Sequence, residues 1–330
     1  MALTLSACGE SKSYQQQIAA MDTVMTLTAY GKNAQKGLKS AVQTITALDA
    51  LVDPDIETST TYALNNANGE KVVVSGQVAE MLLDAIDIYD KTDGSYDLTI
   101  YPLVKRWGFT DGKYYVPTDE EIAQDLSRLC MGQISVSAFP ASGTYAVYMP
   151  SYGQISFASC AKGCASKYAI DAMRKNGVTS GIVSLGGNVQ TLGVKPDGTN
   201  WTVGIVDPNN TSGYLATVSC GETAIVTSGS YQRYNPEYPK YHHIISPKTG
   251  YPTTNGLKSV TIICSDGTIA DCLSTAMYVV GESAALSYWK TYGGFEMILI
   301  NSNNEITATI GLQEKIDVKN TNYTLKYYEG

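Results

Sequence analysis

Residues 21–30 read Met-Asp-Thr-Val-Met-Thr-Leu-Thr-Ala-Tyr. Apolar and polar side chains alternate along this stretch, a period of two that is typical of a strand with one buried face. Directly after it, apolar residues from Leu38 to Leu48 recur at helical spacing, which predicts an amphipathic helix over residues 34–52. The chain therefore builds its core from both strands and helices.

The same patterns, read outward from this stretch, predict the remaining elements. Thr118 and Glu121 have the spacing of a capping box and predict a short helix through Leu129. Other helices are expected at 78–89, 161–176, 268–280 and 283–292, a β-rich stretch at 133–160, and strands at 181–184, 201–206, 215–219, 295–300, 305–310 and 322–328. No steady strand–helix–strand rhythm appears, so the predicted fold class is α+β with mainly antiparallel sheet.

Composition limits the range of functions. The chain has 330 residues, of which 44% are hydrophobic and 16% charged, enough to bury a large core as one domain or two interleaved lobes. Its net charge is -8 and it has no cluster of lysine or arginine, which excludes nucleic acid as an expected partner.

The N-terminus carries a possible lipid-attachment motif. Leu5-Ser-Ala-Cys8 resembles the lipobox of bacterial lipoproteins, in which the cysteine is acylated. Residues 1–8 are interpreted as a truncated signal remnant, residues 9–19 as a polar tether, and residues 20–330 as the folded domain. The expected location is the outer face of the bacterial cell membrane, anchored at Cys8; the alternative is an ordinary cysteine. No later segment has the roughly 18 apolar residues of a membrane span.

The other six cysteines lack the spacing of a metal site. None forms a Cys-x-x-Cys pair, and no cysteine–histidine spacing fits zinc. We expect mostly free, buried thiols at Cys130, Cys160, Cys164, Cys220, Cys264 and Cys272.

Both histidines of the chain lie in residues 241–250, Tyr-His-His-Ile-Ile-Ser-Pro-Lys-Thr-Gly. Histidine is the side chain best suited to act as a base near neutral pH. Adjacent side chains in an extended segment point to opposite faces, so we expect one of His242 and His243 to face a site and the other to pack or meet solvent. The alternative is two structural histidines.

A carboxylate and two hydroxyls follow on a predicted helix. Asp271 and Thr275 are four residues apart and share a helix face, with Ser274 beside them. These oxygen donors suit a hard cation such as Mg²⁺, which retains waters or substrate phosphates as its other ligands. The alternative is a solvated aspartate near a helix N-terminus.

Two further motifs each allow two interpretations. Gly186-Gly187 allows backbone amides to approach a ligand, or makes an ordinary hairpin turn. Ser159-x-x-Lys162 and residues 248–250, Lys-Thr-Gly, are two of the three signatures of serine β-lactamases. The third signature, Ser-Asp-Asn, is missing between them, and flanking prolines predict a turn where those enzymes have a strand.

Eight motifs in the same order resemble the ApbE-type FAD:protein FMN transferases, over about residues 20–320. They are Met21-Asp-Thr, Ser59-Thr-Thr-Tyr-Ala-Leu-Asn65, Gly94-Ser-Tyr-Asp-Leu-Thr99 with Trp107-Gly-Phe109, Ala161-Lys-Gly-Cys-Ala165, Leu185-Gly-Gly-Asn188, Thr227-Ser-Gly-Ser-Tyr231, His243-Ile-Ile-Ser-Pro-Lys-Thr-Gly250 and Ala270-Asp-Cys-Leu-Ser-Thr275. The resemblance implies an α+β fold of two interleaved lobes with the flavin nucleotide in a cleft between them. It also implies Mg²⁺-dependent transfer of FMN from FAD to a Thr or Ser hydroxyl of an acceptor flavoprotein, with AMP leaving. FAD pyrophosphatase activity and non-catalytic FAD binding by a lipoprotein are the alternatives.

The resemblance also assigns roles to single residues. It implies that His243 is the base, and that the cation is held by the Ser159 carbonyl, Asp271 and Thr275, with Ser274 adjacent. Positions matched to the flavin nucleotide are Met21, Ser95, Tyr96, Asp97, Ser156, Lys162 and Ile245. The chain departs from the family at four places. Ser156-Phe-Ala158 replaces Asp-Leu-Gly, Cys164 replaces a tyrosine, Ser246 replaces an aspartate, and the tyrosine that usually precedes Pro-Asp-Ser has no counterpart near Asp55.

Overall fold

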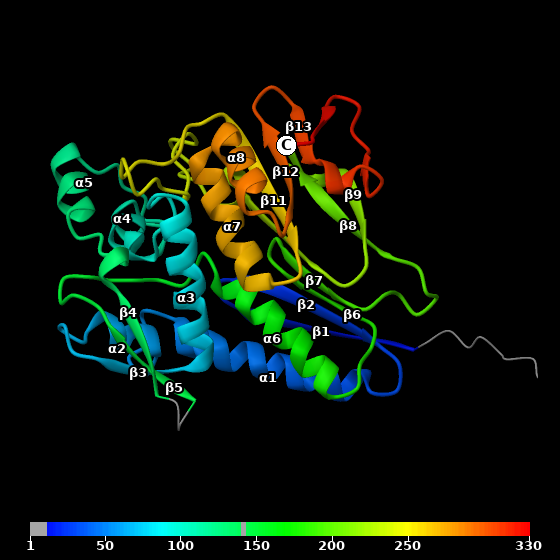
Figure 1. The fold of residues 1–330 in the computed structure, drawn as a ribbon, viewed down its shortest axis with the longest axis horizontal. Coiled ribbons are helices and arrows are strands. Elements are labelled where there is room, and N and C mark those ends of the chain that lie inside the picture. Colours follow the sequence, from blue (N-terminus) through cyan, green and yellow to red (C-terminus); the bar gives the residue numbers. More distant parts are fainter. Residues whose placement is uncertain (1–11, 140–142) are drawn as a thin grey trace, which may run out of the picture.

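The computed structural model describes residues 12–139 and 143–330 (Figure 1). The helices of this described part are α1 (Ala34–Val52), α2 (Thr60–Asn65), α3 (Gly76–Lys91), α4 (Tyr101–Arg106), α5 (Asp119–Leu126), α6 (Ala161–Lys175), α7 (Gly267–Val280) and α8 (Glu282–Tyr292). The strands are β1 (Ser13–Ala20), β2 (Thr23–Tyr30), β3 (Val72–Ser75), β4 (Ser135–Phe139), β5 (Thr144–Tyr148), β6 (Gly181–Leu185), β7 (Asn188–Leu192), β8 (Trp201–Asp207), β9 (Asn210–Cys220), β10 (Ala224–Gly229), β11 (Leu257–Cys264), β12 (Glu296–Asn301), β13 (Glu305–Thr309), β14 (Ile316–Val318) and β15 (Thr324–Tyr328).

One large sheet organises the molecule. Its order is β1-β2-β6-β7-β10-β11-β12-β13-β15, and the β13–β15 pair is parallel while its other neighbouring pairs are antiparallel. Two three-stranded antiparallel sheets accompany it, β14-β9-β8 and β3-β5-β4. The structure thus confirms the predicted α+β class with mainly antiparallel sheet.

The large sheet is covered differently on its two faces. Helices α1, α6 and α7 pack on one face through the largest hydrophobic core. The β14-β9-β8 sheet covers the other face, where Trp201 and Val203 pack with Ile298. Figure 1 shows α2, α4 and α5 and the β3-β5-β4 sheet gathered on the far side of α3 from the large sheet.

The predicted polar tether is wrong for residues 13–19, because residues 13–20 form strand β1. This strand pairs along its whole length with β2 at the edge of the large sheet. Tyr14 and Ile18 pack against the main core, while the glutamines between them face solvent. An edge strand needs only one apolar face, so three consecutive glutamines gave it the composition of a linker. Cys8 and the rest of the lipobox motif lie outside the described residues.

The β-rich stretch predicted at residues 133–160 is correct only in part. Strands β4 and β5 account for its first half, whereas residues 149–160 run as turns and irregular chain into α6. The helices at 34–52, 161–176, 268–280 and 283–292 are confirmed to within about a residue at each end, and the capping box of Thr118 and Glu121 is present at α5. Of the described helices, none is long and apolar enough to span a bilayer.

The prediction of free thiols is confirmed for the six cysteines of the described part. All six are unpaired, and all but Cys264 are buried.

Candidate active site

Two tight turns lie together at one end of the large sheet. Met21 and Asp22, between β1 and β2, have φ of 49° and 58°, and Gly186 and Gly187, between β6 and β7, have φ of 56° and 95°. Two successive positive φ angles are the mark of a type I′ hairpin, so the hairpin interpretation of the double glycine is correct. A Cβ added at Gly186 would lie 2.5 Å from the hydroxyl oxygen of Thr23, which shows how closely the turns approach.

The first turn of α6 meets the middle of α7 through a glycine. The Gly163 amide donates to Oδ2 of Asp271 at 2.7 Å. A Cβ at Gly163 would lie 2.0 Å from the carbonyl oxygen of Gly267 and 2.6 Å from the Cβ of Asp271, so only glycine permits this crossing. Asp271 therefore satisfies one of the free amides at the N-terminus of α6, where no side chain of the preceding residue does so.

The Asp271 carboxylate is buried, and a single backbone amide is its hydrogen-bond donor in the described part of the chain. It is 4% exposed. Burial raises its pKa above the usual value, and the Lys162 charge and the Gly163 amide oppose that shift. A buried charge is costly unless it is paired or binds a metal. The environment of Asp271 therefore suits a bound cation.

Two residues with hydroxyl side chains follow Asp271 on α7, and both reach strand β10. Ser274 and Thr275 both contact the Ser228 hydroxyl of β10, at 2.8 Å and 3.2 Å between oxygens. The Ser274 hydroxyl also donates to the backbone carbonyl of Asp271 at 2.8 Å. In residues 12–139 and 143–330, no three His, Cys, Asp or Glu side chains gather as metal ligands. A cation here would rest on one carboxylate with hydroxyl and carbonyl oxygens, a donor set that fits Mg²⁺ better than zinc.

Tyr96 joins three of the predicted segments. Its hydroxyl lies 3.0 Å from the Ser159 hydroxyl and donates to Sγ of Cys272 on α7 at 3.3 Å. The ring is 2% exposed. The segment after α3 is therefore fixed against both the loop before α6 and the helix that carries Asp271.

Asp97 and Ser156 make local contacts. Oδ1 of Asp97 accepts from the amide and the hydroxyl of Thr99, both at 2.6 Å, and burial raises its pKa to about 6. The Ser156 hydroxyl accepts from the Ala158 amide at 3.2 Å. Ser95 is buried beside them. These three residues were matched to the flavin nucleotide. Ser95 and Asp97 flank Tyr96 in the sequence, and Ser156 lies in the loop whose Ser159 contacts Tyr96.

The charge of Lys162 acts on both Asp271 and His243. Its ammonium donates to the Ala158 carbonyl at 3.3 Å. Its positive charge holds down the pKa of Asp271 and also lowers that of His243. Asp271 and His243, which are distant in the sequence, are therefore both affected by the positive charge of Lys162.

The two histidines differ as the extended segment predicts. Both ring nitrogens of His242 are engaged, Nε2 with the Thr253 carbonyl at 2.9 Å and Nδ1 with the Ile244 amide at 3.3 Å. The ring is buried and packs edge-on against Tyr278. His242 is thus held as a structural residue.

His243 keeps one nitrogen open. Its Nδ1 lies 3.0 Å from the Arg233 carbonyl, which can only accept, so Nδ1 carries the proton and Nε2 the lone pair. Nε2 has no hydrogen-bond partner in the described part of the chain. Burial lowers the pKa of His243 well below its usual value, and the charges of Arg233 and Lys162 act in the same direction. The ring therefore stays neutral at pH 7, as a general base requires.

Two other predicted positions contribute little through their side chains. Ile245 is buried in a small core with Trp107 and Phe109. Met21 is half-buried, and its amide donates to Oδ1 of Asp49 at 3.1 Å. A ligand could contact Ile245 through its backbone or meet its buried side chain as part of a wall.

The β-lactamase-like motif is not assembled. Residues 248–250 form a turn closed by the Gly250 amide on the Ser246 carbonyl at 2.8 Å, where those enzymes have a strand. The Lys248 ammonium pairs with Asp93 on the surface. The structure thus supports the turn that the flanking prolines predict.

Ser228, Arg233 and Asn188 were not among the predicted site residues. Ser228 and Asn188 lie within motifs quoted for the family resemblance, but their neighbours are known only once the sheet is assembled. The Arg233 carbonyl orients His243 through a backbone group, which leaves no signal in the sequence.

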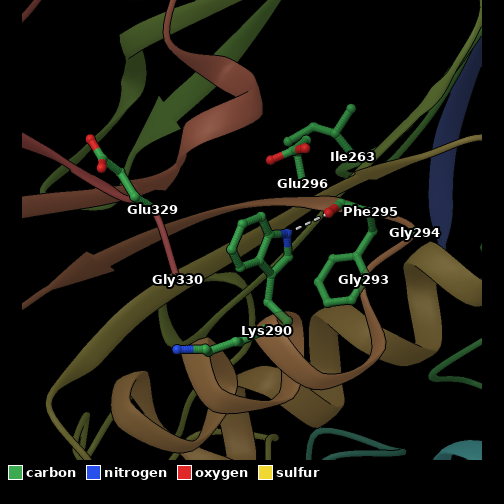
Figure 2. Close-up of a pocket in the computed structure, with 9 residues that line it drawn as sticks. Ile263, Lys290, Gly293, Gly294, Phe295, Glu296, Glu329 and Gly330 are labelled. Atoms are coloured by element: carbon green, nitrogen blue, oxygen red, sulfur yellow. Dashed lines mark hydrogen bonds between the residues drawn. The ribbon is translucent and has the colours of Figure 1, made fainter.

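Two surface pockets are found among the described residues. One is an open pocket of about 660 Å³ at the ends of α8 and β12, where the Trp289 ring donates to the Phe295 carbonyl at 2.7 Å (Figure 2). A second pocket of about 180 Å³ borders Gly94. Neither is lined by a predicted site residue, so the candidate site rests on the side-chain cluster.

Comparison with known proteins identifies the family of the chain. Curated FAD:protein FMN transferases resemble the chain along most of its length: that of Treponema pallidum is 25% identical over 98% of this chain and 94% of its own, and that of Haemophilus influenzae is 26% identical over 92% and 91%. The crystal structure of the ApbE protein from Thermotoga maritima superposes with a TM-score of 0.84 at 25% identity, covering 92% of this chain and 99% of that one. The profile of the ApbE family matches residues 21–299. The chain therefore belongs to the ApbE family.

Proposed function

We propose that this protein is an FAD:protein FMN transferase. In this proposal it passes FMN from FAD to a Thr or Ser hydroxyl of an acceptor flavoprotein, forms a phosphoester bond, and releases AMP in a Mg²⁺-dependent reaction. The single observation that carries the proposal is the buried Asp271 carboxylate, which the Gly163 amide holds at 2.7 Å against the first turn of α6, next to Lys162. The names of the curated relatives support the same activity.

The proposed step uses the open nitrogen of His243. The acceptor oxygen forms a bond to the FMN phosphorus as its proton moves to Nε2, and the bond from that phosphorus to the bridging oxygen breaks. AMP departs with that bonding electron pair. Arg233 holds the tautomer through its carbonyl, so the lone pair is in place before the acceptor arrives. Lys162, in the first turn of α6, would favour the growing negative charge through its ammonium.

The cation would be held by Asp271 and Thr275 on α7, with Ser274 adjacent, and by the Ser159 carbonyl. Bound there, Mg²⁺ would supply positive charge that offsets negative charge on the substrate phosphates. The orientation of Asp271 toward α6 by the Gly163 amide supports this placement.

The flavin nucleotide would contact Met21, Ser95, Tyr96, Asp97, Ser156, Lys162 and Ile245. Because the side chains of Tyr96 and Ile245 are buried, we assign these two a role through backbone groups or as part of the wall. The open end of the two I′ turns, beside Met21, supports an approach of the nucleotide from that edge of the sheet.

The test is to incubate the protein with FAD, Mg²⁺ and an acceptor domain, and to measure the intact mass of the acceptor and the AMP released. A mass gain equal to one FMN, with matching AMP, is the expected result, and EDTA should abolish both. Release of AMP without a mass gain would instead indicate an FAD pyrophosphatase. FAD that stays bound and intact would indicate a non-catalytic FAD-binding protein.

We also propose that the protein is anchored by lipid on Cys8 at the outer face of the bacterial cell membrane. The support is the lipobox-like Leu5-Ser-Ala-Cys8. Mass spectrometry of the native N-terminus tests it, and an unmodified Cys8 would contradict it.

A further inference from the structure

Asn188 is an unusual buried side chain. It is 0% exposed, and in the described part of the chain neither its Oδ1 nor its Nδ2 has a hydrogen-bond partner. Buried side-chain amides are nearly always paired, because leaving such groups unpaired costs free energy. A carboxamide with both ends unpaired suggests that its partners belong to a ligand or its waters.

The side chain of Asn188 faces α6 and α7. Side chains alternate along a strand, so Asn188 and Gln190 lie on the same face of β7. Oε1 of Gln190 accepts from the Ser166 hydroxyl of α6 at 2.9 Å, which fixes that face as the one covered by the helices. A Cβ added at Gly267, at the start of α7, would also lie 2.5 Å from Oε1 of Gln190.

The strand register places Asn188 at the level of the candidate cation site. On β10, Ala224 is paired with Gln190 and Val226 with Asn188, and Ser228 is the next residue on that face. On α7, Gly267 lies beside Gln190, whereas Thr275 contacts Ser228.

Asp271 is one helical turn beyond Gly267 and one turn before Thr275. Its level along the sheet is therefore that of Asn188. Gly163 of α6 contacts both Gly267 and Asp271, so it closes the same space from the other side.

We propose that Asn188 is a positioning residue of the cation site, whose carboxamide is satisfied when a divalent cation and its waters are bound. Its amide group can donate to a carboxylate oxygen of Asp271, and its oxygen can accept from a cation-bound water. This inference rests on the cation of the proposed function. Such outer partners hold ligands in orientation, and their loss typically weakens metal binding.

The test compares Mn²⁺ binding and stability in the full chain with Asn188→Leu, a substitution of similar volume. Electron paramagnetic resonance of free Mn²⁺, with AMP present, gives the dissociation constant. We expect Asn188→Leu to weaken Mn²⁺ binding by ~10–100-fold. Without cation, its resistance to urea should be equal or greater, because two unpaired polar atoms are removed.

Ser180→Ala is the matched control. The Ser180 hydroxyl is also buried and unpaired, but it precedes β6 at the end away from the hairpin turn. This variant should bind Mn²⁺ as the wild type does. If the wild type binds Mn²⁺ and Asn188→Leu binds it equally well, the role of Asn188 is wrong while the proposed function stands. If the wild type binds no Mn²⁺, both the cation of the proposed function and this inference are wrong.

Asn188→Asp gives a second test should the leucine variant fail to fold. A second carboxylate beside Asp271 should destabilise the cation-free protein and be rescued by Mn²⁺, so that Mn²⁺ raises the unfolding temperature more than in the wild type. Equal destabilisation with and without Mn²⁺ would overturn the inference.

Discussion

Two carboxylates of α7, its N-cap and one a turn further along, have opposite surroundings. Asp266, the N-cap, accepts from the amides of Thr268 and Ile269 at 2.9 Å and 3.2 Å and pairs with the ammonium of Lys167. Asp271, in the next turn, is more deeply buried and accepts from one amide, that of Gly163. The same helix therefore carries one well-compensated carboxylate and one that is not.

The difference separates a structural role from a functional one. A carboxylate with two amides and an ion pair stabilises the fold as it stands. A buried carboxylate with fewer partners lowers the free energy of unfolding unless a ligand supplies the missing partners. Such a local loss of stability is typical of functional sites. Asn188, with no partner at all, belongs to the second group by the same reasoning.

The first prediction removes the under-compensated carboxylate. Asp271→Ala should abolish both FMN transfer and FAD cleavage, because the cation would lose its charged ligand whichever nucleophile attacks. AMP release and acceptor mass measure the two reactions, and EDTA should reproduce the effect in the wild type. Turnover at the wild-type rate in either case would remove Asp271 from the site.

The second prediction concerns two adjacent histidines, of which His242 has a structural role and His243 the proposed functional role. His243→Ala should cut FMN transfer by ~10²–10⁴-fold, the usual contribution of a positioned general base, while FAD still binds. His242→Ala should chiefly lower stability, because both its ring nitrogens are engaged within the fold. Transfer kinetics and thermal unfolding of both variants decide between them. A dead His242→Ala that remains folded would reverse the assignment.

The third prediction is a pH profile. Burial lowers the pKa of His243, so the base stays neutral as pH falls through about 6.5, the ordinary value of histidine. We therefore expect kcat/KM for transfer to stay level from pH 8 to about 6.5 and to decline only at lower pH. The unfolded chain binds the extra proton in that lower window, so the free energy of unfolding should also decrease there as pH falls.

The variant Lys162→Met tests whether the charge of Lys162 lowers the pKa of His243. Removing its positive charge should let the pKa of His243 rise, and the acidic limb of the profile should move to higher pH. A limb that stays in place would show that Lys162 does not act on the base.

The sequence was a good guide wherever periodicity reflects burial on one face. α1 and α7 were predicted nearly to the residue because their apolar positions follow the helical repeat. β1 was missed because an edge strand with one half-buried face can carry glutamines at its other positions. Its identity depends on pairing with β2, which is a tertiary contact.

The site was predicted from motifs, but its connections were not. The family resemblance named Asp271, Lys162 and His243, and the structure brings the first and last within the field of Lys162. The contact of Asp271 with Gly163 depends on how α6 crosses α7. The isolation of Asn188 depends on the register of β7 and β10. Neither is a local property of the sequence.

The last prediction tests Asp266, the carboxylate with several partners, and has the smallest expected effect on activity. Lys167 pairs with both Glu80 and Asp266, and burial together with the Asp266 charge raises the pKa of nearby Asp84 to about 6. Lys167→Met would leave these acidic groups facing one another with no cation between them. We expect the free energy of unfolding to fall by ~1–3 kcal/mol, as for other partly buried polar groups that lose a partner.

FMN transfer by Lys167→Met should stay within about twofold of the wild type, since none of these groups contacts the proposed reacting atoms. Tyr168→Phe, which removes one hydrogen bond to Glu80, is the matched milder variant and should cost ~0.5–1.5 kcal/mol. Urea unfolding and transfer assays well below the unfolding temperature measure both. A large loss of transfer in folded Lys167→Met would mean that Asp266 and Asp271 are coupled, and the separation of structural from functional carboxylate would then fail.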